Sequence, residues 1–125
     1  MKVKILPSKT SGEVSAPPSK SFAHRYLIGS VLSRGKCVIK NIADSDDISA
    51  TLSCIEQLGG SVTKDGNIVT VIPTNEKQIE NAVFDCKESG STLRFFIPVV
   101  LATGAKNCTF LGSERLLARG IKEYE

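Results

Sequence analysis

The spacing of apolar and polar residues along the chain predicts alternating helices and strands. The clearest helix is predicted over residues 45–59, where apolar residues recur every three or four positions and fall on one face. Ser45 can cap the start of this helix, and Gly59 can close its end. The same criteria predict helices at residues 20–33 and 91–103, strands at residues 3–6, 13–16, 36–41, 82–86 and 107–112, and a hairpin that turns at Asp65 and Gly66.

The predicted elements follow one another in an order that repeats. From residue 13 the order is β-α-β-α-β-β, and a further β-α-β follows it. Arg25 lies ten residues before Gly35, as Arg94 does before Gly104, and in both cases an apolar helix and then a strand follow. The sequence therefore predicts an α+β fold of repeated β-α-β-α-β-β units, with helices packed on a mixed sheet.

The composition narrows the class of protein without identifying it. A chain of 125 residues, of which 41% are hydrophobic, is long enough for one domain with a core. Its net charge of +3 slightly favours small anionic ligands and is too weak to predict nucleic-acid binding. The longest apolar run, at residues 95–102, is too short to span a membrane, and the first residues lack the apolar segment of a secretory signal. We therefore expect a cytoplasmic protein that is not bound to a membrane.

The cysteines and the single histidine do not form a metal motif. No CxxC pair occurs, so a zinc site is not predicted. His24 cannot be assigned to a Ser-His-Asp or Cys-His arrangement from spacing, and a lone histidine is more often structural than catalytic. We expect four reduced and mostly buried thiols: Cys37, Cys54, Cys86 and Cys108.

The stretch PPSKSFAHR begins a predicted helix with cations. Acidic residues are the usual choice in a first turn, because they oppose the positive end of the helix dipole. Here Ser19 can cap the helix, and Lys20, Ser21, His24 and Arg25 follow with no carboxylate nearby in the sequence. Ser21 and Arg25 are four residues apart and share a face, which suits a phosphate or carboxylate ligand. A solvated basic face is an equally good interpretation of these residues alone.

The stretch ESGSTLRFF predicts a second helix start that can bind an anion. Gly90 allows close approach of a ligand to the backbone, and Arg94 lies within the first turn. An ordinary N-cap at Ser91 or Thr92 is the more frequent explanation of such a turn. Pro98 is expected to kink this helix, because it removes a backbone hydrogen bond.

The C-terminal stretch SERLLARGIKE adds Arg115 and Arg119, four residues apart, for which surface solvation is a sufficient explanation. Asp46 and Asp47 are likewise explained as acidic residues in a first helical turn. The last residues, GIKEYE, look like the opening of a helix that the sequence does not close. We therefore expect the chain to be a fragment of a longer protein.

Four ordered stretches, PPSKSFAHR, NIADSDDISATLSCIEQLGG, ESGSTLRFF and GSERLLARGI, together resemble the N-terminal part of the 5-enolpyruvylshikimate-3-phosphate synthase family. The sister family, UDP-N-acetylglucosamine enolpyruvyl transferase, fits less well, because it has Asn at the position of Ser21 and lacks the Arg25 pattern. The resemblance implies transfer of the enolpyruvyl group of phosphoenolpyruvate to the 5-hydroxyl of shikimate 3-phosphate, with release of phosphate. It implies no metal and no organic cofactor.

The resemblance also implies roles for individual residues. It implies that shikimate 3-phosphate is held by Lys20, Ser21 and Arg25. It implies that phosphoenolpyruvate is contacted by Lys20, Gly90 and Arg119, with Lys20 as the catalytic residue. Supporting roles fall to Asp47, Ser91 and Arg94. Three residues depart from the family pattern without removing a charged ligand-binding side chain: Glu88 and His24, where Asn is common, and Gly120, where Pro is common.

The family fold consists of two globular halves, each built from three β-α-β-α-β-β units in an inverted α/β barrel-like arrangement, with the active site between them. The resemblance implies that residues 1–18 form strands that pack with the other half. Residues 19–125 would form part of the N-terminal substrate-binding domain, about one and a half units. We therefore expect the remaining C-terminal part of the enzyme as a partner and no turnover from this chain alone.

Two other classes of protein compete with this interpretation. An α+β module that binds RNA phosphates would fit the fold and the mildly basic charge. Against it, the chain has no Trp and only two Tyr, so the stacking surface for single-stranded nucleic acid is not predicted. A purely structural domain with solvated charges would bind no ligand at all.

Overall fold

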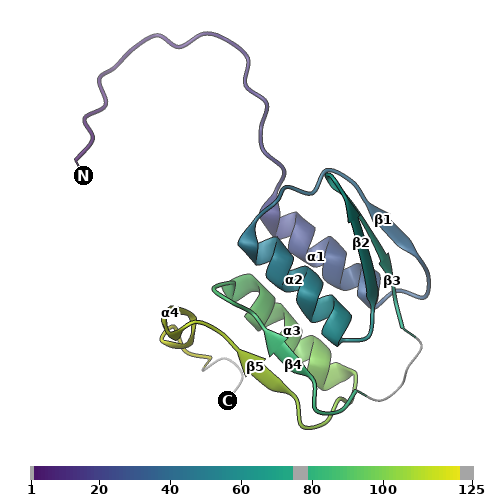
Figure 1. Cartoon of the computed structure of the whole chain (residues 1–125). Coiled ribbons are helices and arrows are strands. Elements are labelled where there is room, and N and C mark those ends of the chain that lie inside the picture. Colours follow the sequence, from purple (N-terminus) through teal and green to yellow (C-terminus); the bar gives the residue numbers. More distant parts are fainter. Residues whose placement is uncertain (1, 75–78, 122–125) are drawn as a thin grey trace.

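The computed structural model describes residues 2–74 and 79–121, and it has an α+β fold (Figure 1). The helices and strands follow in the order α1 (Lys20–Val31), β1 (Cys37–Ile39), α2 (Asp46–Gln57), β2 (Ser61–Asp65), β3 (Ile68–Ile72), β4 (Val83–Asp85), α3 (Gly90–Ala102), β5 (Thr109–Leu111) and α4 (Glu114–Leu117). From α1 to β5 this is the order that the sequence predicts. None of the described helices is long and apolar enough to cross a membrane.

Local signals in the sequence explain where α2 begins and ends. The side chain of Ser45 accepts a hydrogen bond from the backbone N–H of Ile48 at 3.2 Å, which confirms the predicted N-cap. At the other end, Gly59 has a φ of 89° and donates its N–H to the carbonyl of Glu56, while the N–H of Gly60 bonds to the carbonyl of Ile55. These two bonds form a Schellman motif, and they confirm that Gly59 closes the helix.

The strands form two separate sheets in the described part of the chain. One is antiparallel with the order β1-β3-β2, and the other is a parallel pair of β4 and β5. The prediction of a single mixed sheet is therefore wrong for the described residues. The hairpin between β2 and β3 is confirmed, but Asp65 pairs with Ile68, so its turn residues are Gly66 and Asn67.

A single hydrophobic core joins the two sheets to the helices. Helices α1 and α2 pack against the three-stranded sheet, and α2 also contacts β4. Phe84 on β4 lies between two rings: its centroid is 6.0 Å from that of Phe96 on α3 and 5.1 Å from that of Phe110 on β5. Helices α1, α2 and α3 run side by side, and their N-terminal ends lie on the left in Figure 1.

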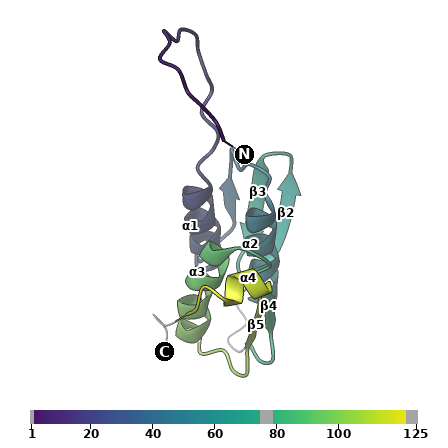
Figure 2. The ribbon, with the colours of Figure 1, turned by 90° about the vertical axis from the view of Figure 1, so that its left-hand side faces the viewer.

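The N-terminal segment departs from the prediction. Residues 3–6 and 13–16 are predicted as strands, but the structure assigns no strand to them. The described segment before α1 extends away from the body of the molecule (Figures 1 and 2), and its apolar side chains, such as Ile5 and Val14, are exposed. A strand needs a neighbour to pair its backbone N–H and C=O groups, and nothing described here lies beside this segment.

Two smaller differences concern α3 and α4, whereas the prediction of free thiols is confirmed. Helix α3 begins at Gly90 with Ser89 as its N-cap and continues through Pro98, whereas Ser91 or Thr92 was the predicted cap. Helix α4 was not predicted, and the helix expected at the C-terminus falls largely on residues 122–125, outside the described residues. All four cysteines are free; two are buried, Cys54 and Cys86, and two are half-buried, Cys37 and Cys108.

Candidate functional site

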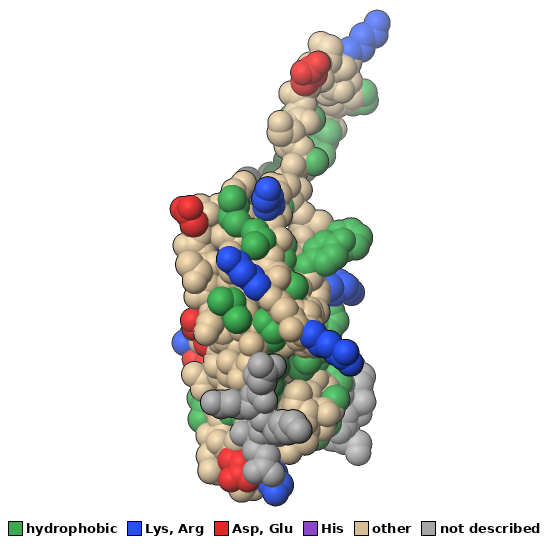
Figure 3. Space-filling model, turned by 90° about the vertical axis from the view of Figure 1, so that its right-hand side faces the viewer, with side chains coloured by type: hydrophobic (Ala, Val, Ile, Leu, Met, Phe, Trp, Pro, Cys, Tyr) green, Lys and Arg blue, Asp and Glu red, His purple; other side chains and the backbone are tan. Residues whose placement is uncertain are grey.

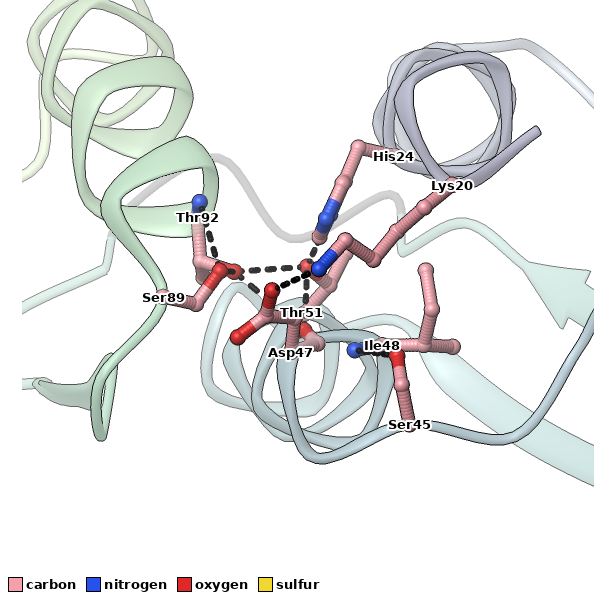
Figure 4. A network of polar contacts seen from close by, with 8 residues as sticks. All are labelled: Lys20, His24, Ser45, Asp47, Ile48, Thr51, Ser89 and Thr92. Atoms are coloured by element: carbon pink, nitrogen blue, oxygen red, sulfur yellow. Dashed lines mark hydrogen bonds and ion pairs between the residues drawn. The ribbon is translucent and has the colours of Figure 1, made fainter. Parts of the chain in front are cut away.

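The start of α1 supplies the first cation of the site. Ser19 caps the helix by accepting a hydrogen bond from the N–H of Phe22, as predicted. Lys20 points across to α2, where its Nζ atom donates to Oδ2 of Asp47 at 2.5 Å (Figure 4). The fold therefore places a carboxylate beside the start of α1, although the local sequence of this helix contains none.

Arg25 lies one turn further along α1 and connects it to α3. Its Nη1 atom donates to the backbone carbonyl of Ser21 at 2.8 Å, which confirms that the two residues share a face. Its guanidinium lies over the ring of Phe95 on α3, 4.9 Å from the ring centroid. Ser21 and Arg25 are both exposed, so a ligand can reach them from solvent.

The start of α3 brings two further guanidiniums together. A Cβ atom placed on Gly90 would lie 3.1 Å from Nη1 of Arg94 and 3.5 Å from Nη1 of Arg119. Arg119 reaches this position because α4 turns the chain back, with Leu116 buried against the body of the protein. The predicted residues Gly90, Arg94 and Arg119 are therefore neighbours, and Ser91 lies exposed in the same helical turn.

The first turns of the three long helices meet at this place. Lys20 bridges the starts of α1 and α2, and the side chain of Thr92 in α3 lies 3.4 Å from the backbone carbonyl of Asp47 in α2. Each helix start carries N–H groups without a partner in its own helix, together with the positive end of the helix dipole. This end of the molecule therefore suits anions. On the opposite side of the molecule, charged side chains are dispersed among apolar and polar ones (Figure 3).

A series of buried polar side chains, which the sequence does not predict, lies beneath the cations. Nδ1 of His24 lies 2.7 Å from Oγ1 of Thr51, which lies 2.8 Å from Oγ1 of Thr92, which in turn lies 2.7 Å from Oγ of Ser89 (Figure 4). One signal was available: Thr51 is a polar residue on the otherwise apolar face of α2, three residues after Ile48.

The electrostatics of the site act on His24. Burial lowers the pKa of its imidazole below the ordinary value, and the charges of Lys20 and Arg25 lower it further. The carboxylate of Asp47 acts in the opposite direction and raises the pKa. Burial dominates, so His24 is neutral at physiological pH.

A hollow of about 430 Å³ adjoins the first turn of α2, but half of its lining residues are acidic. It is lined by Asp46, Asp47, Ser49, Ala50, Ser53, Asp85, Lys87 and Glu88. Of the predicted site residues only Asp47 belongs to it, so the predicted cations do not face this hollow. Among the residues that the structure describes, no group of three or more His, Cys, Asp or Glu is arranged to hold a metal ion.

Comparisons with known proteins agree on one family. The family model described as EPSP synthase (3-phosphoshikimate 1-carboxyvinyltransferase) matches residues 6–124. Similar curated proteins, all named 3-phosphoshikimate 1-carboxyvinyltransferase, occur in Clostridium botulinum strain Eklund 17B, Clostridioides difficile strain 630 and Clostridium novyi strain NT.

Sequence identity to these relatives is 45%, 44% and 40%, respectively, and the matches cover 94%, 94% and 98% of this chain. They cover only 27%, 28% and 30% of the relatives, so the chain spans less than a third of their length. The match to the family model nonetheless extends over nearly the whole chain. The chain therefore belongs to the EPSP synthase (3-phosphoshikimate 1-carboxyvinyltransferase) family.

Proposed function

We propose that this chain is the N-terminal part of a 3-phosphoshikimate 1-carboxyvinyltransferase and supplies half of its substrate-binding site. In this proposal Lys20, Ser21 and Arg25 bind shikimate 3-phosphate. Phosphoenolpyruvate binds between Lys20 and the pair formed by Gly90 and Arg119. The observation that carries the proposal is the convergence of the Arg94 and Arg119 guanidiniums on Gly90, at the same end of the fold as the start of α1.

The chemistry of the two substrates explains why cations gather here. Both are polyanions, and they must be held close together for the 5-hydroxyl of shikimate 3-phosphate to add to the double bond of phosphoenolpyruvate. The methylene carbon is protonated during this addition, and loss of a proton and of phosphate then restores the double bond. Arg side chains bind phosphate and carboxylate oxygens through two N–H groups at once, and helix starts add further donors.

Lys20 is the catalytic residue in this proposal because it would contact both anions. Its ion pair with Asp47 holds the ammonium at the start of α1 before any substrate is bound. An incoming phosphate or carboxylate can then share the ammonium with Asp47 or replace the carboxylate as its partner. Ser91 and Arg94 support the site from the first turns of α3.

The remaining parts of the active site would come from the C-terminal part of the enzyme. We propose that it completes the repeated β-α-β-α-β-β units of an inverted α/β barrel-like fold and that it pairs with residues 1–18 as strands. Residues 19–125 then form part of the N-terminal substrate-binding domain. We place the complete enzyme in the cytoplasm, without a cofactor, and we expect no turnover from this chain alone.

An amide NMR titration of the chain with shikimate 3-phosphate tests the proposal. We expect shifts at Lys20, Ser21 and Arg25, larger than those caused by inorganic phosphate at the same ionic strength. Arg25→Ala should abolish them. Arg34→Ala, which removes an exposed arginine beyond the end of α1, should not. Equal shifts with both ligands, or a response that survives in Arg25→Ala, would contradict the proposed binding site.

A further inference from the structure

His24 is a buried histidine that the proposed binding scheme does not use. Its side chain is 0% exposed, as are those of Thr51 and Thr92, and Ser89 is 1% exposed. The imidazole contacts Thr51 through Nδ1, while Nε2 is buried without a hydrogen-bond partner among the described residues. A buried polar atom in this state calls for an explanation, because most such atoms are satisfied.

The neighbours of the ring favour one tautomer. The hydroxyl of Thr51 has a single proton and three polar neighbours: the backbone carbonyl of Asp47 at 3.1 Å, Oγ1 of Thr92 at 2.8 Å and Nδ1 of His24 at 2.7 Å. The carbonyl of Asp47 can only accept, so we assign the Thr51 proton to it, and the contact of 2.7 Å is then a hydrogen bond from Nδ1–H to the Thr51 oxygen. Nε2 is then a bare acceptor, which also avoids an unpaired N–H in the interior.

This contact is the first of a series of hydrogen bonds that links three helices. His24 is on α1, Thr51 is on α2, and Thr92 is on α3, while Ser89 is the residue that caps α3 just before Gly90. Each link between them is 2.7 or 2.8 Å long. Short, buried hydrogen bonds resist sliding of one helix past another, since a shift leaves a buried donor unpaired.

We propose that His24 is a positioning residue for the anion site. As the neutral Nδ1–H tautomer, it anchors the N-terminal half of α1 to Thr51 and, through Thr92, to the cap of α3. This fixes Lys20 and Ser21 relative to Gly90, and thus the two proposed substrate-binding groups relative to each other. The consequence for substrates rests on the proposed function, whereas the tautomer and the helix positions do not.

The first measurement is the tautomer itself. His24 is the only histidine of the chain, so long-range ¹H–¹⁵N NMR spectra of the labelled protein report on this ring alone. At pH 7.5 we expect a protonated Nδ1 and an unprotonated Nε2. A ring protonated at Nε2 only, or one that exchanges rapidly between the two tautomers, would overturn the proposal.

The second measurement compares two amide side chains, each of which can place its nitrogen near one of the two ring nitrogens. In His24→Asn the amide nitrogen occupies the place of Nδ1 and can donate to Thr51, whereas in His24→Gln it occupies the place of Nε2. We expect the Asn variant to keep the amide resonances of Ser89 and Gly90 and to bind inorganic phosphate within about twofold of the unaltered chain. The Gln variant should shift both resonances and bind phosphate about tenfold more weakly, equivalent to about 1.4 kcal/mol.

The outcomes separate the positioning role from the proposed function. Equal effects of the two substitutions on Ser89 and Gly90, or none from either, would refute positioning by His24. A Gln variant that does not fold, beside an Asn variant that does, supports it. If neither phosphate nor shikimate 3-phosphate binds the unaltered chain specifically, the proposed function fails, and the Ser89 and Gly90 resonances still decide whether His24 positions the helices.

Discussion

The Nζ atom of Lys20 lies 2.5 Å from Oδ2 of Asp47, so the first cation of the site shares its charge with a carboxylate on the neighbouring helix. The two side chains are 55% and 28% exposed, respectively. Ion pairs this accessible to water contribute about 0–1 kcal/mol to stability. The pair therefore matters for where the ammonium points and for the local charge, and much less for holding the fold together.

Replacement of Asp47 by Asn should strengthen anion binding. The substitution frees the charge of Lys20, so we expect the affinity for inorganic phosphate to rise a few-fold at low ionic strength and the gain to shrink as salt is added. The pKa of His24 should fall, because Asp47 raises it. NMR titrations with phosphate and with pH measure both effects. Asp46→Asn is the matched control, and weaker phosphate binding by Asp47→Asn alone would mean that orientation of Lys20 outweighs its charge.

Replacement of Gly90 by Ala should weaken anion binding without unfolding the chain. The added methyl group would stand 3.1 Å from Nη1 of Arg94, the end of a flexible side chain that can move aside. The space between Gly90 and the two guanidiniums would then be smaller, so we expect the affinity for phosphoenolpyruvate or phosphate to fall about tenfold, equivalent to about 1.4 kcal/mol.

Gly29→Ala is the matched control for this prediction. Gly29 lies within α1, and a Cβ atom there would meet nothing within 4 Å. The control should gain about 0.5–1 kcal/mol of stability from helix propensity and keep its phosphate affinity. Urea unfolding and phosphate titration of both variants make the comparison. Unaltered phosphate affinity in Gly90→Ala would show that the anion does not approach the backbone at this position.

Replacement of Thr51 by Val should destabilise the chain by about 2 kcal/mol. Valine has nearly the same shape, but it removes the oxygen that His24 and Thr92 contact, and it leaves a buried donor unpaired. Thr51→Ser keeps the hydroxyl and loses only a methyl group, for which we expect about 1 kcal/mol. The free energy of unfolding in urea distinguishes the two. A valine variant as stable as the unaltered chain would show that the hydroxyl contacts of Thr51 contribute nothing net.

The helices could be predicted from the sequence because their signals are local. Ser45 and Gly59 cap α2 in the predicted manner, since each acts on backbone groups within a few residues of itself. The cap of α3 was assigned wrongly, because the stretch Ser-Gly-Ser-Thr offers three candidate caps. Ser89 is the residue that caps α3, and its side chain contacts both the backbone N–H and the hydroxyl of Thr92. The hydroxyl of Thr92 also contacts Thr51 on α2, a contact that the local sequence does not reveal.

The features that local sequence did not predict depend on contacts between residues far apart in the sequence. Lys20 and Asp47 are 27 residues apart, so the local sequence of α1 does not reveal its carboxylate. The local residues alone explained Arg119 as a solvated surface residue, and only the family resemblance grouped it with Gly90, beside which its guanidinium lies in the structure. The strands at residues 3–6 and 13–16 have the right pattern, but a pattern alone cannot supply the neighbouring strand that would pair with them.

Stability should depend on pH through His24, and the sign follows from its environment. Burial lowers the pKa of this imidazole in the folded chain, whereas in the unfolded chain it lies near the ordinary value of about 6.5. Below that value the unfolded chain binds more protons than the folded one. Stability must therefore fall as the pH drops below about 6.5, and level off once the folded ring is also protonated.

Urea unfolding between pH 8 and pH 5 should show this loss, and His24→Asn should remove it, because the variant retains the bond to Thr51 and has no group that titrates there. Asp85 provides an internal comparison. The hydrogen bond from Lys87 lowers the pKa of its carboxyl group, so the stability that it contributes is present above its unfolded pKa of about 3.9 and is lost only below that value. The contribution of Asp85 is therefore nearly constant between pH 8 and pH 5, where the loss due to His24 begins. A pH dependence between 8 and 5 that is identical in the unaltered chain and in His24→Asn would show that the ring is not the group responsible, and a stability that rises on acidification would mean that Asp47 outweighs burial in setting the pKa of His24.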